Sequence, residues 1–206
     1  MQLRFACDLT GEEYVNQQAW RDASLRRCPL HPRGGCGFAR HGTYERLSPP
    51  GTLIARWYCP QGHRTFSLLP DCLAARLPGT LAEVEAVVGA VEQADGLEAA
   101  CSDLRLEIEL PGVLRWARRR VQAVHASLIL LKGLLPELFA DCEPTLGGFA
   151  QRLGLPAVLS ALRQIAAPFL PRLPAPLGFS PRGARGGVQE NVSQHPRGAD
   201  PPNLLA

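Results

Sequence analysis

The chain has 206 residues, of which 46% are apolar and 20% charged, and its formal net charge is +3. This length holds one medium domain or two small ones, and the apolar fraction is enough for a packed core without disulfides. Seven unevenly spaced cysteines are a poor disulfide framework, and the small net charge is only weak support for a polyanion partner. The composition therefore favours a reducing compartment, with the cytoplasm as the default location.

The sequence predicts neither export nor membrane insertion. The first residues, MQLRFACDLTGEEY, place acidic side chains where a secretion signal needs an apolar core. The most apolar stretch, residues 121–139, is interrupted by His125, Lys132, Pro136 and Glu137, whereas a spanning helix needs about 20 predominantly apolar residues. We therefore expect a buried helix there and no membrane partner.

Composition divides the chain into four regions, and the fold class expected from them is α+β, mostly α. They are an N-terminal arm (1–27), a segment that holds the Cys/His pairs and the turn residues (28–78), a Leu/Ala/Val-rich helical domain (79–170) and a Pro/Gly/Arg-rich tail (171–206). The arm contains a segment suited to one short helix, over residues 11–23. The tail has no apolar period, so we expect it to be disordered after about Phe179.

The second region has the pattern of a small β-sheet. FARHGTYERL and TLIARWYC predict two strands joined by the turn SPPG, and RTFSLL predicts a third, short strand. These strings are rich in the β-branched and aromatic residues that fit a pleated surface.

The third region predicts several helices. Thr80 and Glu83 form a capping box ahead of an apolar run that should be helical to about Ala94. A helix beginning near Pro111 carries one apolar stripe as far as Leu128. Further helices are expected over residues 96–104, 134–141, 146–153 and 157–169.

Two Cys/His pairs predict one structural zinc site. Cys28 and Cys36 lie in CPLHPRGGCG, and Cys59 and His63 lie in CPQGH. Zinc prefers four nitrogen or sulfur donors at tetrahedral corners, and proteins present such donors in two tight turns that face each other. The intervening strands would bring these turns together as a hairpin, so the ligands expected are Cys28, Cys36, Cys59 and His63.

Other interpretations of these residues remain open. His31 could replace Cys36 in a Cys-x2-His turn, although the glycine after Cys36 favours the cysteine. The cysteines could also be buried thiols without metal, or three ligands could hold a catalytic zinc with an open position. The remaining cysteines lie among apolar residues and are expected to be buried thiols without a nearby partner. They are Cys7, Cys72, Cys101 and Cys142.

The segments CPLHPRGGCGFARHGTYER and ARWYCPQGHRTFSLLPDCLAAR resemble the N-terminal zinc-ribbon segment of bacterial insertion-sequence transposases and their short stand-alone relatives. In that family a CPxxxCG knuckle leads to an HGTY strand, and a strand ending in Cys-x-x-Cys runs into RTFSLLP. A helix-turn-helix follows, and its last helix carries an RWxRR run, here Arg115-Trp116-Ala117-Arg118-Arg119. The resemblance covers about residues 26–122, and it implies that residues 28–78 are a zinc ribbon and that residues 79–170 are a helix-turn-helix-like domain.

The resemblance implies a zinc cofactor, a double-stranded DNA partner and an association with a mobile element, whose transposase or other protein could be a second partner. The chain departs from the family pattern at the second knuckle, which is Cys-x3-His. No catalytic domain follows in this chain, so we expect no transposase activity from it.

A cluster of polar residues on the helix that begins near Pro111 is the candidate DNA-binding surface. Arg115, Arg118, Arg119 and Gln122 recur at helical spacing opposite the apolar stripe. Arginine binds phosphates and guanine edges, and a recognition helix presents such side chains to the major groove. The alternative is a solvated basic face, because arginine replaces lysine almost everywhere in this chain and Lys132 is the only lysine.

No motif in the sequence predicts an enzyme. The carboxylates of the third region fall on expected helices and loops, and the chain contains no phosphate-binding loop, GxSxG or HExxH. We therefore expect a non-catalytic zinc-ribbon DNA-binding protein, transposase-derived or accessory to a mobile element. The alternative is a protein-interaction adaptor that uses the ribbon and the helical region to bind a partner protein.

Overall fold

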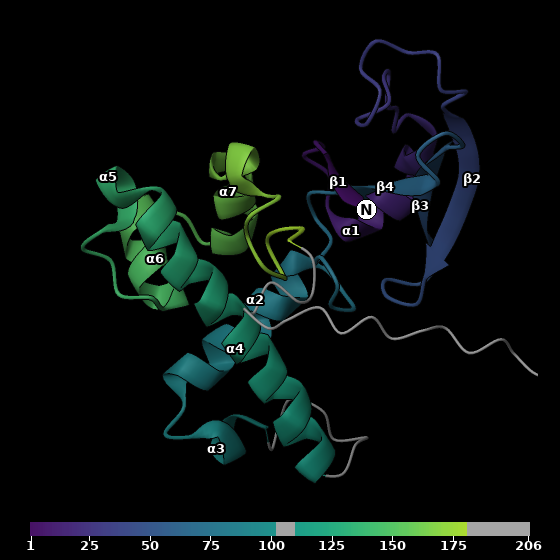
Figure 1. Cartoon of the computed structure of the whole chain (residues 1–206). Coiled ribbons are helices and arrows are strands. Elements are labelled where there is room, and N and C mark those ends of the chain that lie inside the picture. Colours follow the sequence, from purple (N-terminus) through teal and green to yellow (C-terminus); the bar gives the residue numbers. More distant parts are fainter. Residues whose placement is uncertain (102–109, 181–206) are drawn as a thin grey trace, which may run out of the picture.

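The structure is a computed structural model of the whole chain, and it describes residues 1–101 and 110–180 (Figure 1). Within these residues a small sheet and a larger set of helices form an α+β fold, as the sequence predicts. The strands are β1 (Gln2–Phe5), β2 (Ala39–Arg46), β3 (Thr52–Cys59) and β4 (Arg64–Pro70). The last three are the strands expected from the sequence.

The sheet has the strand order β1-β4-β3-β2. β2, β3 and β4 form an antiparallel meander, whereas β1 pairs in parallel with β4, with Leu3 opposite Leu68. The sequence pattern does not predict β1, because the strand is only four residues long and half-buried throughout, so it shows no alternation. Through β1, the N-terminal segment therefore belongs to the same sheet as residues 39–70 and is not a separate arm.

One face of the sheet is covered by the segment after β1. This segment forms helix α1 (Gly11–Asn16) and a 3-10 turn, η1 (Ala19–Arg21), in place of the single helix expected over residues 11–23. Thr10 and Glu13 form a capping box at the start of α1. Arg40 on β2 donates hydrogen bonds to the Trp20 and Arg21 carbonyls, which fixes η1 against the sheet.

The other face of the sheet and the loops beside it pack against the helical part.

The helical part begins with α2, whose first turn carries the predicted Thr80–Glu83 capping box. The helices are α2 (Leu81–Gln93), α3 (Leu97–Cys101), α4 (Leu110–Leu134), α5 (Pro136–Phe139), α6 (Leu146–Leu153), α7 (Val158–Ile165) and the 3-10 turn η2 (Ala167–Phe169). Among the helices in the described ranges, none has the length and apolarity to cross a membrane.

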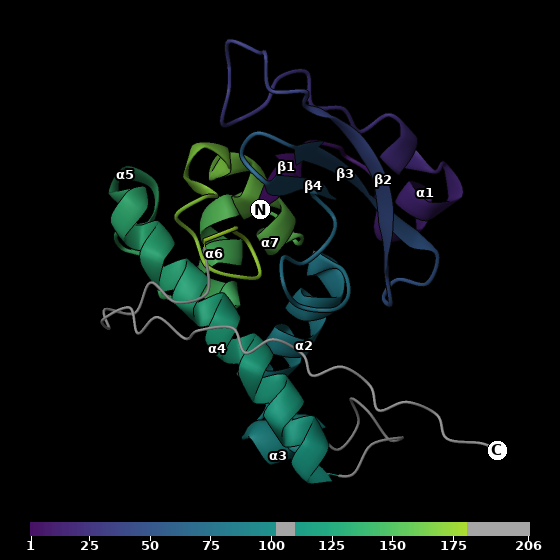
Figure 2. The same ribbon diagram turned by 45° about the vertical axis from the view of Figure 1, so that its right-hand side comes forward.

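The alternation of side chains along the strands divides the interior into two cores. On β3, Ala55 and Trp57 face the core shared with α1 and η1, while Ile54 faces the helices. On β4, Leu68 and Leu69 divide in the same way. In Figures 1 and 2 the loop before β2 lies beyond the sheet, and α3 lies beside the first turns of α4 at the opposite end.

The segment after η2 is part of the fold, which corrects the expected domain boundary at residue 171. Leu173 and Leu177 are completely buried, and Phe179 is 8% exposed, all in the core that contains the helices. Ser127 on α4 donates a hydrogen bond to the Pro174 or Ala175 carbonyl, at 3.3 Å and 3.2 Å. Three apolar residues spread among prolines show no period, which explains why the sequence did not reveal them. Residues 181–206, where disorder is expected, lie outside the described ranges.

Arg163 holds this last segment to the sheet. Its side chain on α7 is completely buried, and burial lowers its pKa to about 10. The guanidinium donates to main-chain carbonyls of two segments, the turn after β4 and the loop that follows η2. The acceptors are Pro70, Asp71, Leu73, Pro176 and Leu177. A buried cation surrounded by carbonyls therefore joins the β and α parts of the molecule.

Candidate metal centre

Four side chains from two segments meet where β3 turns into β4. Cys28, His31 and Cys36 come from the loop before β2, and Cys59 is the last residue of β3. Their donor atoms all lie within 4.8 Å of one another. His31 Nδ1 lies 3.3 Å from Cys59 Sγ and 3.6 Å from Cys28 Sγ. The three cysteines are buried, and His31 is partly exposed.

These separations fit a tetrahedral zinc ion. With zinc–ligand bonds of about 2.0–2.3 Å, tetrahedral angles place neighbouring sulfur and nitrogen donors about 3.5 Å apart. Three thiols and one imidazole are also a donor set typical of structural zinc, and four protein donors leave no open position for a substrate. The arrangement can hold one metal ion and connect the loop to the sheet.

Local turns in the loop before β2 position the first three donors. The His31 amide donates to the Cys28 carbonyl and the Gly34 amide donates to the His31 carbonyl, so the chain reverses twice over seven residues. Gly35 and Gly37 on either side of Cys36 have φ values of +80° and +65°, which glycine adopts without strain. These reversals return the chain so that Cys36 faces the same point as Cys28.

The β3–β4 turn positions the fourth donor. The Gly62 amide lies 3.2 Å from Cys59 Sγ and donates to it, as in other metal knuckles where amides point at sulfur. A Cβ atom at Gly62 would lie 2.6 Å from Leu30 Cδ1 and 3.4 Å from Cys59 Sγ. Glycine therefore lets the two turns approach each other closely.

The environment shifts the thiol pKa values in opposite directions. Burial raises the pKa of Cys28, but hydrogen bonds from His31 and from the amides of the turn outweigh it, and the pKa falls to about 7. Burial raises the pKa of Cys59, and the Gly62 amide opposes that shift only in part. A bound cation would favour the thiolate at both positions.

His63, which the sequence suggested as the fourth donor, lies outside this group, and His31 lies within it. The backbone of His63 has a φ of +46°, and its exposed side chain places Nδ1 3.4 Å from the Tyr58 hydroxyl. Successive residues of a strand point to opposite faces, so a side chain near Tyr58 is turned away from Cys59. The sequence feature that could have identified His31 as a donor is its Cys-x2-His spacing from Cys28.

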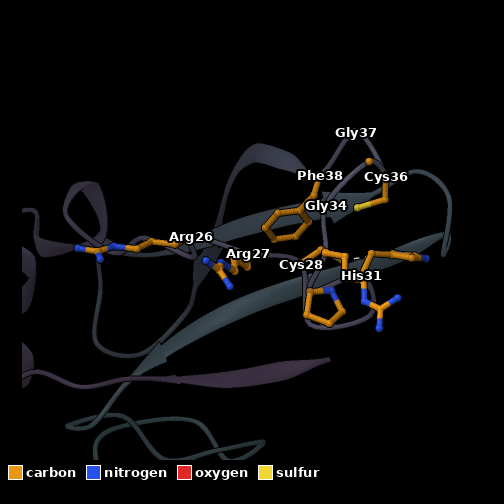
Figure 3. A pocket seen from close by; sticks show the side chains of 11 residues that line it. Arg26, Arg27, Cys28, His31, Gly34, Cys36, Gly37 and Phe38 are labelled. Carbon is orange, nitrogen blue, oxygen red and sulfur yellow. Dashed lines mark hydrogen bonds between the residues drawn. The ribbon is translucent and has the colours of Figure 1, made fainter.

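The loop that carries Cys28, His31 and Cys36, called the metal loop below, also lines a basic hollow of 690 Å³ (Figure 3). Figure 3 shows Arg26 and Arg27 toward one end of it and Cys28, His31 and Cys36 toward the other. Arg33 is a third arginine in its lining, and none of the described lining residues is acidic. These three arginines form no motif in the sequence that would predict a shared surface.

The residues proposed for DNA contact lie on one exposed face of α4. Arg115, Arg118, Arg119 and Gln122 are all exposed, while Val113 and Ala117 on the opposite side are buried. Arg115 and Arg119 also line a hollow of 470 Å³ together with Arg76, Arg120 and Trp116, and Arg120 stacks over the Trp116 ring at 4.0 Å. The expected helix-turn-helix would include residues 102–109, between α3 and α4, which lie outside the described ranges.

Comparison with protein-family models, with curated proteins and with solved structures finds no match to this chain. The metal centre and the basic hollows are therefore interpreted from their own chemistry.

Proposed function

We propose that the chain holds one structural zinc ion through Cys28, His31, Cys36 and Cys59. The observation that carries this proposal is the convergence of four donor atoms within 4.8 Å. Zinc would contribute on the order of 10 kcal/mol to the folding of this region. The clustered thiols require reducing conditions, which agrees with a location in the cytoplasm.

We further propose that the protein binds double-stranded DNA without catalysing a reaction. The supporting observation is the basic face of α4, where Arg115, Arg118 and Arg119 are exposed and close to the hollow lined by Arg76. Guanidinium groups at this spacing suit phosphate oxygens along a duplex. The resemblance to insertion-sequence transposases supports the same partner and suggests an origin in a mobile element.

The metal loop would supply a second and separate contact. Figures 1 and 2 place the loop before β2 and the start of α4 at opposite ends of the molecule. A straight duplex touching both would have to run along the length of the protein. We therefore assign the main contact to α4, and we assign orientation of the duplex to the hollow lined by Arg26, Arg27 and Arg33.

A mobility-shift experiment at two salt concentrations tests DNA binding. Replacing Arg115, Arg118 and Arg119 by alanine should reduce the slope of log affinity against log salt by up to about 3, because each phosphate contact contributes about 0.9. Arg152→Ala with Arg172→Ala is the matched control, since both arginines are exposed and lie away from this face. Because the control removes two charges and the test variant three, equal losses per arginine removed would mean that bulk charge alone causes binding.

The adaptor hypothesis rests on a different surface. Ile129 and Leu130 on α4 and Leu138 on α5 are 58%, 38% and 40% exposed. Exposed apolar side chains on consecutive helices could contribute to a protein-binding surface, because such surfaces are typically apolar. Duplex binding that is weak at both salt concentrations and indifferent to the α4 arginines would favour this second function.

A further inference from the structure

A second pair of cysteines, Cys7 and Cys72, meets outside the metal centre. β1 and β4 are parallel, and their last pair is Phe5 opposite Pro70. Each cysteine lies two residues beyond that pair, so both follow the same end of two neighbouring strands. No partner was expected for either thiol, but in the structure each lies close enough to the other to shift its pKa.

The surroundings keep the two thiols together and accessible. Arg4 makes a bidentate pair with Asp71, at 2.8 Å and 2.6 Å, and so ties the end of β1 to the residue before Cys72. Both cysteines are partly exposed, and each packs against the core shared with α1 and η1. Neither belongs to the metal group.

The two thiols have different acidities. The hydrogen bond from Cys72 lowers the pKa of Cys7 to about 7 despite burial, and amides of Asp71 and Leu9 act in the same direction. The same contact, with burial, raises the pKa of Cys72. Cys7 is therefore the nucleophile of the pair, and Cys72 keeps its proton longer.

We propose that Cys7 and Cys72 are a reversible redox pair, which a low-molecular-weight disulfide such as oxidised glutathione converts to an intramolecular disulfide. The Cys7 thiolate attacks one sulfur of the reagent, forms a mixed disulfide and releases one glutathione thiolate. Cys72 loses its proton to solvent and attacks the Cys7 sulfur, and the second glutathione thiolate leaves. Two protein thiols are oxidised, and one small disulfide is reduced to two thiols.

The position of this bond gives it a structural consequence. A bond between residues 7 and 72 closes a loop that contains Cys28, His31 and Cys59 along with Cys36. Cross-links that close long loops restrict the unfolded chain most. The oxidised protein should therefore lose zinc to a chelator more slowly than the reduced protein. Only the expected rate of zinc loss rests on the proposed metal centre; disulfide formation between Cys7 and Cys72 depends neither on zinc nor on DNA binding.

Peptide mapping of the zinc-loaded full chain tests the proposal. After treatment with oxidised glutathione the intact mass should fall by about 2 Da, for two hydrogens lost, and dithiothreitol should restore it. Trypsin places Cys7 in peptide 5–21 and Cys72 in peptide 65–76, and neither peptide contains another cysteine. The unreduced digest should contain these two peptides joined, while the zinc content stays unchanged.

Two variants make the test specific. Cys72→Ser should stop at a glutathione adduct on Cys7, because no second thiol can displace it, and Cys101→Ser should behave as the wild type. The wild-type map decides the question even if a variant folds poorly. Cys7 and Cys72 found free or as separate adducts, or oxidation of Cys28, Cys36 or Cys59 with loss of zinc ahead of a Cys7–Cys72 bond, would overturn the proposal.

Discussion

At the scale of single residues, burial distinguishes side chains that look alike in the sequence. Arg163 and Arg172 both lie near the end of the described chain, yet Arg163 is completely buried and Arg172 is exposed. Cys7 and Cys101 are both cysteines among apolar neighbours, yet Cys7 has a thiol partner and Cys101 is a buried thiol whose pKa burial raises. These differences come from tertiary contacts, so they had no local signal.

Arg163→Met should be strongly destabilising. The substitution keeps most of the volume but leaves several buried carbonyls without a donor, and each unsatisfied group costs about 1–3 kcal/mol. We expect the free energy of unfolding to fall by at least about 3 kcal/mol in urea titrations. Arg172→Met is the control and should change it by no more than about 0.5 kcal/mol. Similar values for both variants would show that the buried cation is dispensable.

The acidity of Cys7 gives a pH dependence that peptide mapping can follow. A thiol reacts as its thiolate, and the thiolate fraction rises as pH passes through the pKa, here lowered to about 7 by the Cys72 hydrogen bond. Alkylation of Cys7 by iodoacetamide should therefore rise about tenfold between pH 6 and pH 8. Cys72→Ala removes the donor and should shift this rise to higher pH. A rise centred near the ordinary thiol pKa in the wild type would contradict the assigned contact.

At the scale of elements, local sequence signals were sufficient where the structure depends on local contacts. The Thr80–Glu83 box, the helix over residues 146–153 and the strands β2 to β4 were predicted from caps, periodicity and turn residues. β1 was missed because a short parallel strand owes its place to a partner that lies far along the chain. The fourth metal donor was also assigned wrongly, to His63 and not to His31, because His31 meets Cys59 through a contact between distant parts of the chain.

The cap of α2 provides a test at this scale. The Thr80 hydroxyl oxygen accepts a hydrogen bond from the Glu83 amide, and the Thr80 amide donates one to the Glu83 carboxylate. Thr80→Ala should lower the free energy of unfolding by about 1 kcal/mol, whereas Thr80→Ser should retain most of it because the hydroxyl remains. Thermal or urea denaturation of the two variants measures the difference, and equal losses would show that the hydroxyl does not act as a cap.

At the scale of the whole molecule, the sheet separates two cores, and distant segments join them. Residues 171–179 return to the core beside Arg163, so the fold is closed by a segment that composition alone assigned to the tail. The same sheet carries Cys59 into the metal centre. Three of the four donors, Cys28, Cys36 and Cys59, were predictable because a hairpin evident in the sequence brings their turns together. The place of His31 depends on how the loop before β2 packs, which has no local signal.

Truncation separates the buried closing segment from the rest of the tail. A chain ending at Ser180 keeps every buried residue of the described part, including Leu173, Leu177 and Phe179. A chain ending at Leu170 loses these three, and removal of one large buried apolar side chain alone costs about 2–5 kcal/mol. The first should melt cooperatively near the wild-type temperature and the second should not fold. Equal stability of both would mean that residues 171–179 contribute nothing.

The zinc content of two histidine variants tests the central claim most directly. The wild type and His63→Ala, purified under reducing conditions and desalted, should each contain about one equivalent of zinc. His31→Ala should lose the metal or bind it at least about tenfold more weakly in a chelator competition, because one of four donors is missing. Retention of zinc by His31→Ala together with loss from His63→Ala would contradict the metal centre described here.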